Sequence, residues 1–239
     1  MDRSRIGIDR DLRPDWLDTA GSVAAQGLEG EPARRAVFEA LEGAIPGADA
    51  YSARGKTTTI LRRIWLRVPV DARSLQAEAA GLLALVPHED RVALHWSMII
   101  AAYPFFNDCA AVAGRLTSLN GSFVRVEHTR RMRELWGQRS TVDRASSRAL
   151  VTMRAMGVLM DAEGRVCEVP RHHADARLSA MLLEAVLLSE DRHEAPAEQL
   201  SSHPALFPFE LESTAVATAG SSRLRMERRG GDTDVVVRA

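Results

Sequence analysis

Five apolar side chains between residues 142 and 156 recur at steps of three, four, four and three residues, which is the period of an α-helix with one buried face. They are Val142, Ala145, Ala149, Met153 and Met156. Ser140 precedes Asp143 by three residues, which predicts a capping box at the start of this helix. Gly157 predicts its end.

The flanking residues extend this helix into a longer pattern. A preceding helix is expected to end near Trp136, with Gly137 as a stop and residues 138–139 as a short turn. After Gly157 come two short apolar segments, residues 158–160 and 165–169, around a polar turn at residues 161–164. Helix, short turn, helix and β-hairpin in this order is the plan of a winged helix-turn-helix. We therefore expect that fold over residues 122–172.

The face of the second helix opposite its apolar stripe is basic. Arginine can bind guanine with two hydrogen bonds, and serine and threonine can reach phosphates or bases. Between residues 123 and 155 eight arginines accompany three carboxylates, a local charge of about +5 in a chain with a formal net charge of −1. We expect double-stranded DNA as the partner of this segment. The candidate contacts are Arg130, Arg131, Arg139, Ser140, Thr141, Arg144, Ser147, Arg148, Arg154 and Arg165.

About six phosphate contacts would lower the affinity roughly 10³-fold between 50 and 200 mM salt. Two alternatives stay open. A helix with a solvated arginine face beside an incidental hairpin has the same pattern, and winged helices also mediate protein contacts.

The rest of the chain predicts a mainly α fold. Helices are expected at residues 15–25, 33–45, 52–66, 72–85, 88–103 and 105–116, with Asp71 as the cap of the fourth. A further helix is expected at residues 178–188, and a loop with a helical turn at 194–204. Four segments result: an N-terminal helical extension (1–50), a helical domain (51–121), the winged helix-turn-helix (122–172) and a C-terminal helix plus β-hairpin (173–239).

The C-terminal hairpin is expected from residues 223–228 and 234–238 around a Gly230-Gly231-Asp232 turn. The first strand and the residue after it carry four arginines: Arg223, Arg225, Arg228 and Arg229. Charged side chains protect an exposed edge strand from pairing with other chains. The alternative is a second contact with phosphate.

We expect no catalysis, cofactor or metal. Gly55-Lys56-Thr57 resembles the end of a phosphate-binding loop, but Ala50 occupies the position where that motif needs glycine. The adjacent His172 and His173 would point in opposite directions on an extended chain, so a surface loop is favoured over a metal site.

Cysteine usage and hydropathy predict a cytoplasmic protein without a membrane partner. Cys109 and Cys167 match no metal or redox spacing and are expected to be reduced. The longest nearly uncharged stretch, residues 92–107, is shorter than the roughly 20 residues that span a bilayer.

Residues 50–239 resemble the BrxA family, the small A component of bacterial BREX phage-defence systems. The resemblance is carried by residues 51–54, 57–63, 94–96, 103–106, 136–159 and 206–209, which include Leu94-His95-Trp96 and Tyr103-Pro104-Phe105-Phe106. It implies a non-enzymatic, DNA-binding component of a multi-gene defence system, with other defence proteins as possible partners. A winged-helix transcriptional regulator and a protein-interaction adaptor remain the alternatives.

Overall fold

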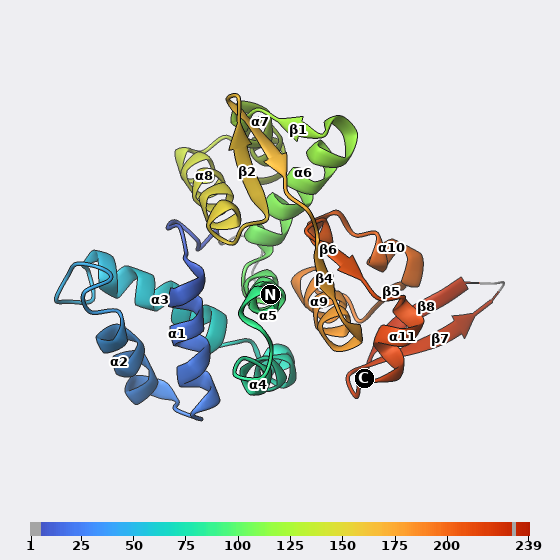
Figure 1. Ribbon diagram of the computed structural model, residues 1–239, viewed down its shortest axis with the longest axis horizontal. Coiled ribbons are helices and arrows are strands. Elements are labelled where there is room, and N and C mark those ends of the chain that lie inside the picture. Colours follow the sequence, from blue (N-terminus) through green and yellow to red (C-terminus); the bar gives the residue numbers. More distant parts are fainter. Residues whose placement is uncertain (1–5, 231–232) are drawn as a thin grey trace.

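The computed structural model describes residues 6–230 and 233–239, and these form a mainly helical molecule with three small sheets (Figure 1). In Figure 1 the helices of residues 14–65 lie on the left, the C-terminal sheet lies on the right, and residues 122–168 form a separate end at the top. The predicted mainly α class is therefore confirmed.

The first four helices are α1 (Pro14–Ala25), α2 (Gly30–Ala40), α3 (Ala53–Trp65) and α4 (Arg73–Leu82). Ser52 caps α3, because its hydroxyl accepts a hydrogen bond from the Gly55 amide at 3.2 Å. The prediction that Asp71 caps the fourth helix is wrong. A 3-10 turn (Val70–Ala72) occupies that position, and Ala72 precedes α4 without a side-chain cap.

Three apolar helices form the centre: α5 (Arg91–Ala102), α6 (Pro104–Asn120) and α9 (Ala176–Ser189). Pro104 ends α5 and opens α6, since proline lacks the amide that a continuous helix would need. Trp96 lies buried among Phe106, Phe207 and Phe209, and its indole nitrogen donates to the Ala205 carbonyl at 3.0 Å. This contact ties the C-terminal third of the chain to α5.

The segment after α6 contains β1 (Ser122–Phe123), α7 (Arg125–Trp136), α8 (Ser140–Ala155), β2 (Leu159–Ala162) and β3 (Arg165–Glu168). The expected order of helix, turn, helix and hairpin is present. The hairpin turn is shorter than expected, because only Glu163 and Gly164 lie between the strands, both with positive φ. β1, which the sequence did not predict, pairs antiparallel with β3 and gives the order β1-β3-β2.

The C-terminal third begins with β4 (His172–Ala174), which pairs in parallel with β6 (Phe209–Leu211). The expected surface loop at His172-His173 is therefore wrong. Residues 194–204 are likewise more regular than a loop, since they contain β5 (Glu194–Pro196), α10 (Ala197–Ser201) and the start of a 3-10 turn (Pro204–Leu206).

The predicted terminal hairpin is confirmed as β7 (Leu224–Arg229) and β8 (Thr233–Arg238), which follow α11 (Thr214–Ala219). Gly231 and Asp232 of its expected turn lie outside the described residues. The sheet order β5-β8-β7 leaves β7 at an edge.

Buried apolar side chains form one cluster that extends from Ile8 to Val236 and includes residues of all four expected segments. Both cysteines are free, Cys109 within this cluster and Cys167 on β3. Over the described ranges no helix combines the length and the hydropathy needed to cross a bilayer.

Candidate nucleic-acid interface

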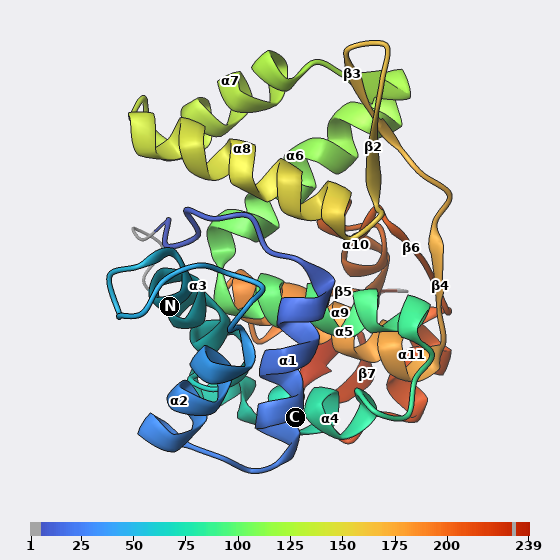
Figure 2. The same ribbon diagram turned by 60° about the vertical axis from the view of Figure 1, so that its left-hand side comes forward.

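The predicted apolar stripe fixes α8 against its neighbours. Val142, Ala145, Ala149 and Met153 are fully buried, and Met156 is nearly so. α8 packs on α6 and α7, and Met132 of α7 is buried in the same core. With this stripe facing inward, the opposite face of α8 lies toward solvent (Figure 2).

The start of α8 differs from the prediction, because no capping box forms. Arg139 holds the N-cap position, so Ser140 is already inside the helix and its side chain caps nothing. Asp143 instead accepts two hydrogen bonds from Arg133 of α7, both at 2.7 Å. The Arg133 guanidinium lowers the pKa of Asp143 and links the two helices.

The end of α8 is as predicted. Gly157 has a φ of 72°, its amide donates to the Arg154 carbonyl at 2.9 Å, and the Val158 amide donates to the Met153 carbonyl at 3.1 Å. This is the Schellman pattern, in which a left-handed residue turns the chain out of the helix. It directs residues 158–162 into the hairpin.

A buried histidine anchors α7 beneath the exposed surface. The His128 ring stacks on Phe123 and its Nε2 donates to the Cys109 carbonyl of α6 at 3.0 Å. Burial lowers the pKa of His128 to about 4, so the imidazole is neutral at pH 7. Sequence reasoning missed this residue, since one histidine in a polar helix gives no local signal of burial.

The exposed face of α8 carries five of the ten predicted contact residues: Ser140, Thr141, Arg144, Ser147 and Arg148. The Arg144 guanidinium has no hydrogen-bonding or carboxylate partner within the described residues. Arg139, in the turn before α8, donates to the Trp136 carbonyl at 3.0 Å. Arg165, on the hairpin, donates to the Ser122 hydroxyl and carbonyl. Neither of these two arginines has a carboxylate partner in the described residues.

The other predicted arginines are paired within the protein. Arg130 bonds Glu127 and Glu134, and Arg131 bonds Glu127. These guanidiniums lower the pKa of Glu127 to about 2. Arg154 is 18% exposed and pairs with Asp161 at 3.2 Å. Glu127 and Glu134 are already part of the local charge of about +5, whereas Asp161 lies outside the counted segment and lowers it further.

An acidic segment borders the basic face of α8. Asp11 accepts a hydrogen bond from Arg148 at 2.9 Å, and the Leu12 amide donates to the Thr152 hydroxyl at 2.9 Å. Ile8 and Leu12 are fully buried, so residues 8–12 are held against the molecule. Sequence reasoning missed this contact, which joins residues about 140 positions apart.

The four arginines predicted on the C-terminal hairpin also pair with carboxylates of the protein. Arg225 pairs with Glu227, Arg228 lies 3.8 Å from Asp234, and Arg229 bonds Glu194. Because β7 is an edge strand, this arrangement favours the edge-protection hypothesis over the second phosphate contact.

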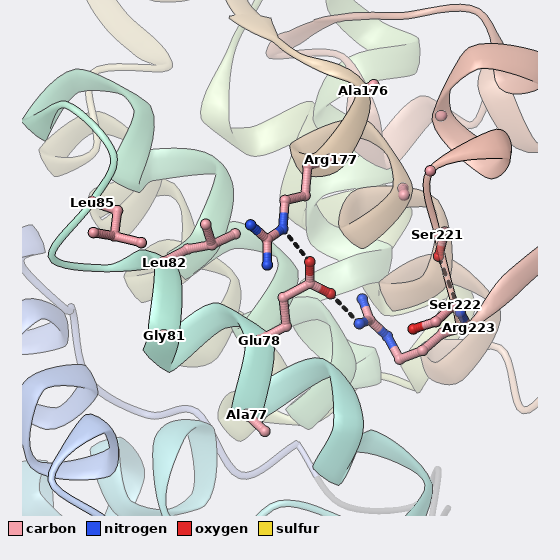
Figure 3. A pocket seen from close by; sticks show the side chains of 13 residues that line it. Ala77, Glu78, Gly81, Leu82, Leu85, Ala176, Arg177, Ser221, Ser222 and Arg223 are labelled. Carbon is pink, nitrogen blue, oxygen red and sulfur yellow. Dashed lines mark hydrogen bonds and ion pairs between the residues drawn. The ribbon is translucent and has the colours of Figure 1, made fainter.

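Arg223 has a different role, at a cavity of about 710 Å³ between α4, α9 and α11 (Figure 3). Glu78 of α4 lies between Arg177 and Arg223 and bonds both. Arg223 also donates to Glu184 at 2.6 Å, and burial raises the pKa of that carboxyl. Two carboxylates balance two guanidiniums here. We call Glu78, Glu184, Arg177 and Arg223 the clamp, because their ion pairs connect α4 to the C-terminal third.

No family model, curated protein or solved structure matches the chain. Within the described ranges no three His, Cys, Asp or Glu side chains are grouped as metal ligands.

Proposed function

We propose that the protein binds double-stranded DNA through the exposed face of α8, by binding alone and without a catalytic step. The observation that carries this proposal is the exposed Arg144, with no acidic partner in the described residues, on a face that also presents Ser140, Ser147 and Arg148. The face lies at one end of the molecule, clear of the C-terminal sheet (Figure 1).

The order of α7, a three-residue turn, α8 and the β2–β3 hairpin supports a winged helix-turn-helix. In this proposal α8 is the recognition helix and the hairpin is the wing. β1 supports the assignment further, because its pairing with β3 fixes the hairpin beside α6 rather than leaving it incidental.

The proposed phosphate contacts are fewer than the sequence analysis expected. Arg139, Arg144 and Arg165 have no carboxylate partner in the described residues, and Arg148 has one exposed partner, Asp11. An exposed ion pair is worth about 0–1 kcal/mol, so Arg148 can exchange Asp11 for phosphate. Four contacts give an expected fall in affinity of about 10²-fold between 50 and 200 mM salt.

The test is the fluorescence anisotropy of a labelled 20-base-pair duplex at 50 mM salt. Arg144→Ala with Arg148→Ala is expected to weaken binding by about 10-fold or more and to make the salt dependence shallower. Arg225→Ala with Arg228→Ala removes the same charge from β7 and is the matched control. Equal affinities for the two double variants would overturn the assignment of α8.

The resemblance to BrxA proteins extends the proposal to a component of a BREX-type defence system. Footprinting separates this role from that of a transcriptional regulator. A regulator is expected to protect one palindromic site strongly, because its half-sites mirror a two-fold dimer. A defence component of the proposed kind is expected to bind broadly and weakly, through phosphates.

Exposed apolar side chains favour a protein-interaction adaptor as the second candidate function. Val126 and Leu135 on α7 are 73% and 57% exposed, and Met160 of the hairpin is 48% exposed. Such side chains add little to phosphate binding and suit a protein contact. If the duplex does not bind even at 50 mM salt, while proteins encoded beside this chain co-purify with it, the adaptor replaces the DNA-binding proposal.

A further inference from the structure

Four arginines near the C-terminal end of α3 line two adjoining cavities. One cavity, of about 600 Å³, lies between residues 6–7, α3 and Tyr103. The other, of about 680 Å³, lies between residues 24–30, the segment after α3 and α4. The arginines are Arg62 and Arg67, which line both cavities, Arg63 in the first and Arg73 in the second.

These guanidiniums lack the internal partners that most arginines of the molecule have. Among the described residues none of the four forms an ion pair or donates a side-chain hydrogen bond. Arg63 stacks on the buried Tyr103 ring, 4.8 Å from its centroid, which fixes the guanidinium plane without neutralising it.

Nearby carboxylates do not balance this charge. Glu29 lines the second cavity, so the walls carry four positive charges against one negative charge. Glu31 feels the charge of Arg62, but its carboxylate is hydrogen-bonded to Arg34.

The position of the cluster at the end of a helix explains only part of it. Basic side chains in the last helical turn are stabilised by the helix dipole. This accounts for Arg62 and Arg63, which lie in the last turn of α3. It does not account for Arg67 and Arg73, which lie beyond that turn and share the same concave surface.

We propose that these cavities form a site for a small ligand with two or more linked phosphate groups. Arginine forks bind phosphate oxygens in pairs, and Arg62 and Arg67 would hold a phosphate chain that passes between the two cavities. Both volumes fall within the range of about 300–1,000 Å³ usual for ligand pockets. Arg62 and Arg63 are half-buried and Arg67 and Arg73 are exposed. Because all four line concave surfaces, they suit a compact polyanion better than a duplex. The site is separate from α8 and does not rest on the DNA-binding proposal.

Calorimetric titration at 50 mM salt with tripolyphosphate, ATP and inorganic phosphate tests the site. Arg62→Gln and Arg67→Gln are each expected to weaken tripolyphosphate binding about 10-fold. Arg115→Gln removes an exposed arginine that lines neither cavity and is expected to change the affinity less than 2-fold. Inorganic phosphate is expected to bind at least 10-fold more weakly than tripolyphosphate, because it cannot span both cavities. ATP is expected to bind with an affinity similar to that of tripolyphosphate if the terminal phosphates make the contacts.

Unchanged tripolyphosphate affinity in both glutamine variants, with unfolding curves like that of the wild type, would overturn the proposal. So would a loss of duplex binding in Arg67→Gln with tripolyphosphate binding intact, since the cluster would then be a DNA contact. Loss of duplex binding in the Arg144 and Arg148 double variant bears only on α8. The two proposals can therefore fail separately.

Discussion

The arginines of α7 and α8 differ in how available they are to a ligand, because each has a different neighbour. Arg144 has no partner in the described residues, Arg148 shares its charge with Asp11, and Arg130 lies between Glu127 and Glu134. Sequence counts treat these arginines as equal. A phosphate replaces no internal carboxylate at Arg144, but it competes with one at Arg148 and with two at Arg130. The structure therefore orders these arginines by their availability to phosphate, whereas the sequence only identifies them as basic.

Asp11 gives the first prediction at this scale. Asp11→Asn removes a negative charge beside Arg148 and is expected to tighten duplex binding about 2- to 5-fold at 50 mM salt, since less like-charge repulsion and no competing carboxylate remain. The measurement is the anisotropy titration. Asp71→Asn, an exposed aspartate in the turn before α4, is the control and is expected to have no effect. Weaker binding by Asp11→Asn would contradict a contact between phosphate and Arg148.

His128 predicts how stability depends on pH. Its folded pKa of about 4 lies below the ordinary value of 6.5, so between these values the unfolded chain holds a proton that the folded chain does not. Stability that is complete above pH 6.5 is therefore lost as the pH falls through about 4, to the extent of about 3 kcal/mol.

The His128 prediction is measured by urea unfolding of the wild type and His128→Gln between pH 7.5 and 4. The variant is expected to be less stable at pH 7 but to lose less on acidification. His95, whose pKa burial also lowers, titrates in both proteins and cancels in the comparison. Parallel pH curves would show that His128 is not buried as described.

At the scale of elements, the exit from α8 is set by one glycine. Gly157 has a φ of 72°, and a Cβ added there would have no other atom within 4 Å, so a substitution meets backbone strain and no steric clash. Gly157→Ala is expected to cost about 1 kcal/mol, and Gly157→Asn less, because asparagine tolerates the left-handed region. Gly220→Ala is the control, since that glycine has a φ of −94° and equal space. Urea denaturation measures all three, and equal costs at the two glycines would contradict the left-handed cap.

Elements were predictable from the sequence where their signals are local. The helix stop at Gly157 and the hairpin after it depend on residues a few positions apart, and both were predicted. The capping box failed because Arg133, ten residues away from Asp143, offers that carboxylate a charged partner. β1, β4 and β6 are two or three residues long and owe their pairing to distant partners, so no periodicity could reveal them.

The candidate site was likewise predictable only where its signals are local in the sequence. Its exposed face was predicted, because helical periodicity assigns the buried and the open side of α8. The charge that remains available on that face was not predictable, because Asp11 and Asp161 reach Arg148 and Arg154 only in the folded chain. The arginine cluster at the end of α3 was missed for a related reason, since residues 62–73 line shared cavities only when α1 packs against both α3 and α4.

At the scale of the whole molecule, ion pairs as well as the apolar core join the N-terminal helices to the C-terminal third. Glu184 is 3% exposed, and its carboxylate accepts from Arg223, which also bonds Glu78 of α4 (Figure 3). Arg223→Met leaves the Glu184 carboxylate buried and without that guanidinium. Removing one partner of a buried pair costs about 3–5 kcal/mol. We expect a loss of this size in urea unfolding.

Arg177→Met is the matched control, because it removes the other guanidinium bound to Glu78. Arg177 is 57% exposed, so its loss is expected to cost no more than about 1 kcal/mol. Adding Glu184→Leu to Arg223→Met is expected to recover part of the stability, since an apolar pair no longer carries an unpaired charge. If Arg177→Met costs as much as Arg223→Met, or the second substitution recovers nothing, burial of Glu184 is not what makes the clamp stabilising. The contact between the N-terminal helices and the C-terminal third would then rest on apolar packing, such as that of α5 on α9 and of Trp96 on Phe207 and Phe209.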